Sequence, residues 1–218
     1  MIRTAVLFDM DGLMVDTEPL ARAAWERVLM PHGLAMTDAL YSQMLGRRTH
    51  ESAQLVLDVL PLPLAREALV ALKTALFLES LADGVPVMPG LFALLDEVER
   101  RGLPWAVATS TPRDVAEIIL GKLGVADRYG ALAAGDEVAH GKPAPDIFLL
   151  AAARLGATPV ACLALEDSAA GCAAAVAAGT RVAAVGAAAM AGGAPFAPAY
   201  RRYPTLAEVA ADLDALLI

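Results

Sequence analysis

Residues 4–17 read TAVLFDMDGLMVDT, and this stretch decides what kind of fold the chain can adopt. The segment from Thr4 to Phe8 is short, apolar and rich in aliphatic side chains, as expected for a strand buried on both faces. It is followed at once by Asp9-Met10-Asp11-Gly12. The pattern predicts a central strand with carboxylates at its carboxyl end.

Similar apolar runs recur along the chain and alternate with amphipathic segments. The further runs are Pro104 to Thr109, Cys162 to Leu165 and Arg181 to Val185. The amphipathic segments have apolar residues at three- and four-residue spacing and end at glycines; they are Leu91 to Arg101, Arg113 to Leu123 and Asp146 to Leu155. The alternation predicts an α/β fold, a parallel sheet covered by crossover helices.

Residues 16–88 differ from the rest, because they show helical patterns and no clear strand. Glu18-Pro19 opens this stretch, and the proline-rich run from Val85 to Gly90 closes it. We therefore expect a catalytic core made of residues 1–15 and 89–218, with residues 16–88 inserted as an all-helical cap domain.

Composition excludes several classes of partner. A net charge of -8 is unfavourable for a phosphate backbone, so no nucleic-acid partner is expected. Asp9 and Asp11 interrupt the first apolar stretch before a signal peptide can form, which predicts a cytoplasmic protein. The stretch from Ala169 to Ala199 has one formal charge, but glycines and prolines interrupt it repeatedly, so no membrane span is expected.

Polar groups follow the predicted strands at four places. They are Asp9 and Asp11, then Thr109-Ser110-Thr111, then Lys142, then Glu166-Asp167-Ser168. Ligands of open α/β sheets bind beyond the carboxyl ends of the strands, so these groups are expected to converge. Each alone has an ordinary explanation; Asp167 or Ser168, for example, would serve simply as a helix cap. Together, carboxylates, a lysine and hydroxyls at one edge suit a hard cation and a phosphoryl group.

Four segments in this order resemble the motifs of the haloacid dehalogenase superfamily. They are LFDMDGLMVDT (7–17), VATST (107–111), GKPAPDIF (141–148) and LALEDSAAG (163–171). The helical insert after the first motif is similar to that family's small helical cap. The resemblance covers essentially the whole chain and implies a Rossmann-like core with the active site at its interface with the cap.

The resemblance also implies a role for each matching residue. Asp9 would attack phosphorus as the nucleophile, and Asp11 would act as general acid and then as general base. Mg²⁺ would be bound by Asp9, the backbone carbonyl of Asp11 and Asp167.

Glu166 would be either a direct ligand of that ion or an orienting residue behind it. Thr109, the backbone N–H of Ser110 and Lys142 would bind the phosphoryl oxygens.

Within the superfamily, Asp11 indicates phosphoryl transfer, because dehalogenases proper lack an acid at this position. Phosphonate-hydrolysing relatives use a cap lysine as a Schiff base. The single lysine of residues 16–88 is Lys73, which is far in sequence from the loop at Gly46 that should face the core. That activity is therefore not favoured.

The closest resemblance is to the branch of β-phosphoglucomutases and sugar-phosphate phosphatases. The mutases have a histidine and an arginine where this chain has Ala21 and Thr49. Because both are absent, the chain is expected to be a phosphatase of a small phosphorylated metabolite, with Gly46, Arg47 and Arg48 in the substrate-binding loop. Arg47 or Arg48 could replace the missing arginine from a neighbouring position.

Two alternatives therefore stay open. One is a β-phosphoglucomutase-type mutase, and the other is a phosphate-binding or interaction module without catalysis. The protein is expected to be a monomer or a weak homodimer.

Overall fold

The computed structural model describes residues 4–217, so residues 1–3 and 218 of the predicted core lie outside the described part. Its centre is a parallel sheet of six strands in the order β3-β2-β1-β4-β5-β6. The strands are β1 (Ala5–Phe8), β2 (Trp105–Ala108), β3 (Ala131–Ala133), β4 (Cys162–Glu166), β5 (Arg181–Val185) and β6 (Arg201–Tyr203). All five neighbouring pairs are parallel, which confirms the α/β, Rossmann-like prediction.

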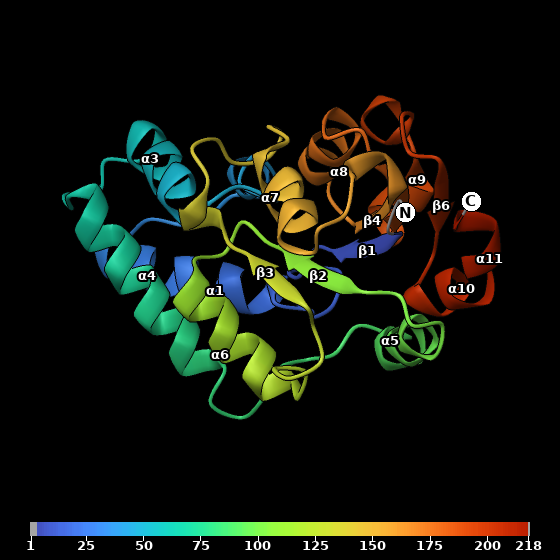
Figure 1. The fold of residues 1–218 in the computed structure, drawn as a ribbon. Helices are drawn as coiled ribbons and strands as arrows, with labels where there is room; N and C mark the ends of the chain where they lie inside the picture. Colours follow the sequence, from blue (N-terminus) through green and yellow to red (C-terminus); the bar gives the residue numbers. More distant parts are fainter. Residues whose placement is uncertain (1–3, 218) are drawn as a thin grey trace.

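Helices cover both faces of this sheet (Figure 1). One face packs on α5 (Leu91–Arg100), α6 (Arg113–Leu123) and α10 (Leu206–Ala211), and the other packs on α7 (Asp146–Arg154) and α8 (Ala169–Ala177). The core also contains α9 (Ala187–Ala191), α11 (Leu213–Leu216), η2 (Gly135–Glu137), η3 (Pro159–Ala161) and η4 (Ala194–Phe196).

The side chains of β1 show how the sequence produces these layers. Val6 and Phe8 lie in the cluster with α5 and α6, whereas Ala5 and Leu7 lie in the cluster with α7 and α8. Successive residues of a strand point to opposite faces, so a strand covered on both faces must be apolar throughout. The continuous apolar run in the sequence is explained by this double burial.

Two strands were not anticipated by the sequence analysis. β3 and β6 are three residues long, and β6 consists of two exposed arginines followed by a buried tyrosine. Both lie at the edges of the sheet, where one neighbour is missing and little apolar surface is buried. Short edge strands therefore lack the apolar run that identified the central ones.

The cap consists of α1 (Glu18–Leu29), η1 (Met30–His32), α2 (Asp38–Ser42), α3 (Thr49–Val59) and α4 (Arg66–Ser80). These helices share an apolar cluster of their own, which includes Trp25, Val56 and Leu69. A separate hydrophobic cluster is what an inserted folding unit requires. The fold therefore contains the predicted all-helical insert.

The two chain segments that join cap and core run side by side. The backbone N–H of Asp16 donates to the carbonyl of Pro86 at 2.8 Å, and that of Met88 donates to the carbonyl of Met14 at 3.0 Å. We propose the cap boundaries at residues 16 and 88 on this basis, because the paired segments are the natural limit between the two apolar clusters.

The Ala/Gly-rich stretch from Ala169 to Ala199 folds into α8, β5, α9 and η4. Within residues 4–217, no helix combines the length and the apolar character needed to cross a membrane.

A glycine at the end of the second joining segment generates a stability prediction. Gly90 has φ +86°, and an added Cβ would overlap the backbone of Ala207 at the start of α10. Gly102, just beyond α5, has φ +65° but no neighbouring atom within 4 Å of its Cβ position. Gly102→Ala therefore tests backbone strain alone, and Gly90→Ala adds steric overlap.

We expect Gly102→Ala to lower the free energy of unfolding by about 1–2 kcal/mol. Gly90→Ala should lower it by a further ~1–3 kcal/mol, because the packed backbone of α10 cannot move away without cost. Urea unfolding followed by circular dichroism measures both. Equal losses would mean that α10 moves away from the added methyl group at position 90 without a cost in stability.

Candidate active site

The polar groups predicted at the strand ends meet at one edge of the sheet. Asp9 directly follows β1, Thr109 directly follows β2, and Glu166 is the last residue of β4. These three strands are neighbours in the order β2-β1-β4, so their carboxyl ends lie next to one another. The fourth group, Lys142, comes from the loop before α7 and reaches the same place.

Lys142 bridges two carboxylates below the floor of the site. Its Nζ donates to Asp9 Oδ1 and, at 2.5 Å, to Glu166 Oε1. All three residues are buried, with relative exposures of 4% for Lys142, 6% for Asp9 and 0% for Glu166. A buried charge is tolerated only when it is paired, so this contact fixes the lysine between β1 and β4.

The second oxygen of Glu166 accepts three hydrogen bonds. Oε2 accepts from the backbone N–H groups of Asp167 and Ser168, each at 3.1 Å, and from the Ser168 hydroxyl at 3.0 Å. A carboxylate has about four acceptor positions. Glu166 thus accepts four hydrogen bonds from protein donors, three on Oε2 and the one from Lys142 on Oε1.

Negative charge exceeds positive charge at this edge. Asp9, Glu166 and Asp167 each place a carboxylate oxygen within 4.8 Å of the others. Burial, and then the charge of Glu166, raise the pKa of Asp9, although Lys142 opposes the shift. Burial and the Asp9 charge raise the pKa of Asp167 in the same way. Burial lowers the pKa of Lys142, but its two carboxylates outweigh that effect and the net shift is upward.

Three carboxylates near one ammonium group leave net negative charge that a further cation would neutralise. The donor set is oxygen only, which is the set that Mg²⁺ and Ca²⁺ prefer. Gly12 makes the approach of Asp167 possible, because it has φ +86° and an added Cβ would overlap the Asp167 carboxylate. The residues present therefore fit a hard divalent cation.

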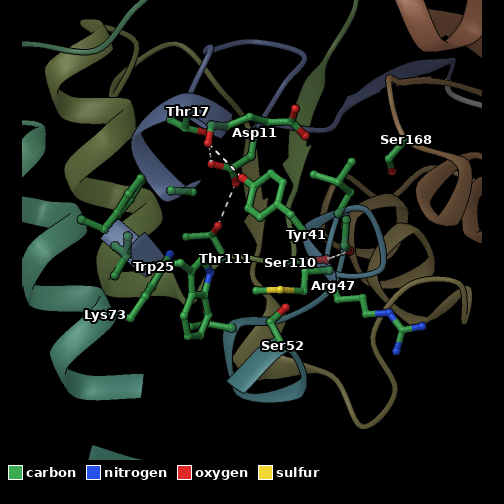
Figure 2. Close-up of a pocket in the computed structure, with 18 of the residues that line it drawn as sticks. Asp11, Thr17, Trp25, Tyr41, Arg47, Ser52, Lys73, Ser110, Thr111 and Ser168 are labelled. Carbon is green, nitrogen blue, oxygen red and sulfur yellow. Dashed lines mark hydrogen bonds between the residues drawn. The ribbon is translucent and has the colours of Figure 1, made fainter. Parts of the chain in front are cut away.

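Three hydroxyl groups donate to the Asp11 carboxylate, and Figure 2 shows those of Thr17 and Thr111 beside it. Oδ1 accepts from Thr17 at 2.6 Å, and Oδ2 accepts from Thr111 at 2.7 Å and from Thr109 at 3.2 Å. Thr17 lies just before α1 of the cap, whereas the other two follow β2 of the core. The carboxylate is thus oriented at the junction of the two units.

The predicted phosphate-binding residues that follow β2 differ in how close they lie to the cavity. Thr109 is fully buried, and its hydroxyl accepts from the backbone N–H of Thr111 at 3.0 Å. Ser110 lies on the cavity wall, and its hydroxyl donates to the carbonyl of Gly46 in the cap loop at 2.9 Å. In this arrangement Ser110 and Thr111 face the cavity, and Thr109 supports them from below.

A cavity lies between this edge of the sheet and the cap. Its core side includes Asp9, Asp11, Ser110, Thr111 and Asp167. Its cap side mixes apolar and aromatic side chains with polar and charged ones. The first group is Trp25, Tyr41, Met44, Leu45 and Phe77, and the second includes Glu18, Arg47, Thr49, Ser52, Lys73 and Thr74. A cavity with carboxylates at its floor and a roof of mixed polarity can hold a small polar molecule whose anionic end contacts a cation bound at the floor.

Lys73 belongs to this cavity, contrary to the expectation from its distance in sequence (Figure 2). It is 8% exposed, and its Nζ lies 4.5 Å from the ring centroid of Phe77 and 5.9 Å from that of Trp25. Burial lowers the pKa of Lys73 to about 8. A signal was present in the sequence: Lys73 is four residues from both Leu69 and Phe77, on the buried face of α4.

The two arginines of the cap loop have different environments. Arg47 is exposed and lines the cavity, whereas Arg48 does not line it. The guanidinium of Arg48 instead contacts Glu51 and the carbonyls of Val138 and Ala139 in the core. Gly46 faces the cavity, as do Ala21 and Thr49, the uncharged residues at the two mutase positions.

Comparison with known proteins agrees with this geometry. Residues 4–179 match the family model of haloacid dehalogenase-like hydrolases. The chain is 38% identical over 174 residues to the fructose-1-phosphate phosphatase YqaB of Escherichia coli, covering 80% of this chain and 92% of that protein. It is 32% identical over 186 residues to hexitol phosphatase A of the same organism, covering 83% and 82%.

Solved structures agree as well. The crystal structure of CbbY from Rhodobacter sphaeroides in complex with phosphate superimposes with a TM-score of 0.83 at 32% identity, covering 96% of each chain. A β-phosphoglucomutase from Clostridium difficile has the same fold, with a TM-score of 0.85 at 21% identity and coverage of 95% and 93%. The family match, the relatives and the ordered site residues together show that the chain belongs to the haloacid dehalogenase-like hydrolases.

Proposed function

We propose that this protein is a Mg²⁺-dependent phosphatase that hydrolyses a small phosphomonoester, such as a sugar phosphate, through a phosphorylated Asp9. The observation that carries the proposal is the pair Asp9 and Asp11 at the floor of a cap-covered cavity, with Lys142 beneath it. Relatives named as phosphatases of fructose 1-phosphate and of hexitol phosphates support the substrate class.

Asp9 has the environment of a nucleophile. Lys142 donates to its Oδ1, and Oδ2 is the remaining oxygen for attack on phosphorus. Attack forms an acyl phosphate on Asp9 and releases the alcohol, and water then cleaves the acyl phosphate to regenerate the carboxylate. Covalent catalysis thereby replaces one difficult displacement by two easier ones.

Asp11 is placed to move protons in both steps. It would protonate the departing alkoxide and then accept a proton from the attacking water. The hydroxyls of Thr17 and Thr111 keep its carboxylate at the boundary of core and cap, where the leaving group must lie.

We propose that Asp9, Asp167 and the backbone carbonyl of Asp11 hold the cation. Glu166 is proposed to orient this site, because its Oε2 accepts three hydrogen bonds from the loop at Asp167 and Ser168 and its Oε1 accepts from Lys142. When bound, Mg²⁺ supplies positive charge that offsets the repulsion between a carboxylate nucleophile and a phosphate dianion.

The remaining contacts hold the two ends of the substrate. Lys142, Ser110 and the hydroxyl-rich loop at Thr109 would stabilise the charge spread over the phosphoryl oxygens. Gly46, Arg47 and Lys73 would line the region of the leaving group. A cytoplasmic location and a monomeric or weakly dimeric state remain predictions.

A screen for phosphate release tests the proposal directly. We expect the purified protein to release phosphate from at least one of a panel of sugar phosphates, nucleotides, phosphoglycolate and glycerol phosphates, with Mg²⁺ and not with EDTA. Asp9→Asn should lower turnover by about three orders of magnitude or more, because an amide cannot form the acyl phosphate. Activity of Asp9→Asn above a few per cent, with contamination excluded, is incompatible with this mechanism.

The role of Asp11 is tested by a matched pair of variants. Asp11→Asn should reduce turnover by about 10²–10⁴-fold, because the amide can neither donate nor accept the transferred proton. Asp16→Asn makes the same chemical change at an exposed carboxylate outside the cavity and should stay within about twofold of the parent, as is usual for such surface sites. Equal rates for the two variants would assign the proton transfers to another group.

A coupled assay separates phosphatase from mutase. Ala21 and Thr49 offer no charge to a second phosphate, so water should capture the phosphorylated Asp9. We expect phosphate release to exceed formation of glucose 6-phosphate from β-glucose 1-phosphate, even with a bisphosphate primer, when both are measured on one sample. Isomerisation about tenfold faster than hydrolysis would overturn the phosphatase proposal and would point to Arg47, the arginine that lines the cavity, as the residue that binds the second phosphate.

A further inference from the structure

The cap touches the core at a point that the proposed chemistry does not use. The Arg48 guanidinium leaves the cavity and crosses to the core, where Nη1 donates to the carbonyls of Val138 at 3.2 Å and Ala139 at 3.4 Å. Figure 1 shows α3, which Arg48 precedes, beside the loop that leads into α7. One cap residue therefore binds the loop that delivers Lys142.

Arg48 is fixed on the cap side as well. Its Nε donates to Glu51 Oε1 at 2.8 Å, and the Glu51 carboxylate also accepts from the Arg48 backbone N–H at 3.2 Å. The side chains are 13% and 29% exposed, so the pair is better shielded than a surface ion pair. A guanidinium held by its own helix presents its remaining N–H groups in a defined direction.

The core loop is shaped to receive this side chain. An added Cβ at Gly141 would lie 2.7 Å from Arg48 Nε and 3.1 Å from its Cδ. The arginine stem therefore packs directly on the backbone of the residue that precedes Lys142. A side chain at position 141 would require the Arg48 side chain to shift.

We propose that Arg48 is a positioning residue, a latch that closes the cap and at the same time fixes the loop carrying Lys142 against Asp9. This inference rests on the proposed phosphatase function for its kinetic consequence, and on the contacts alone for its conformational one. The Nζ of Lys142 must stay between two carboxylates, and a displacement of its loop would move the charge that supports the nucleophile. Misplacement by about 1 Å can cost two orders of magnitude in rate.

The conformational test measures the distance between cap and core in the full-length protein. Spin labels at Gln54→Cys on α3 and Ala153→Cys on α7 occupy exposed positions, whereas the native Cys162 and Cys172 are buried. In double electron–electron resonance with Mg²⁺ present, we expect one short distance for the labelled parent. Arg48→Ala should add a longer component.

A control and a second variant define the outcome. Arg66→Ala removes an exposed cap arginine whose ion pair, with Glu67, lies within the cap, and it should leave the distance unchanged. Gly141→Ala disturbs the contact from the core side and should open the cap as Arg48→Ala does, even if one of the two folds poorly. Unchanged distances in both Arg48→Ala and Gly141→Ala, or an equal change in Arg66→Ala, would overturn the latch.

The kinetic test separates positioning from substrate binding. On the best substrate of the panel, Arg48→Ala should lower kcat about tenfold or more with a smaller change in KM, and Arg48→Lys should restore part of kcat. A rise in KM with kcat unchanged, or an open cap with full kcat, would overturn the positioning role. Absence of turnover in the parent would refute the phosphatase proposal, while the spin-label distances would still decide whether Arg48 closes the cap.

Discussion

A single buried ammonium group between two carboxylates organises the active site. Lys142 comes from a loop, whereas Asp9 and Glu166 end two neighbouring strands, so this contact ties the loop to the centre of the sheet. Removing one partner of such a buried set typically costs about 3–5 kcal/mol, because a charge is left without compensation. Asp9 gains a fixed orientation from the contact, and Glu166 in turn fixes the backbone at Asp167 and Ser168.

The cavity is formed by the sheet edge of the core and by the cap together. The core supplies the charged floor, and the cap supplies a roof of apolar and polar side chains that includes the buried Lys73. Excluding water from such a space would strengthen the attraction between a bound phosphoryl group and a cation held at the floor. Asp11 is bound by hydroxyls from both units, so its orientation depends on how the cap is docked. The orientation of Asp11 and the docking of the cap on the core are therefore physically coupled.

The sequence predicted most of the core because its signals are local. Doubly buried strands produce uninterrupted apolar runs, and the ends of those runs place Asp9 and Glu166 without further information. The edge strands β3 and β6 were missed because they bury little surface and are only three residues long. Lys73 is far from the loop at Gly46 in sequence, which predicts a place outside the site, but the packing of α4 brings its side chain into the cavity. Arg47 lines the cavity and Arg48 contacts core carbonyls. This difference depends on how the cap docks on the core, which the local sequence pattern does not predict.

The paired segments at Asp16 and Met88 give the cap an unusual independence. The two segments cross between the units side by side, so the ends of the insert lie as close together as the ends of a short surface loop. A large insertion at such a place adds little loop-closure entropy. The cap residues proposed to recognise the leaving group can then change over evolutionary time without altering the strand ends proposed to carry the chemistry. One catalytic scaffold can in this way give rise to many enzymes that differ chiefly in the metabolite they accept.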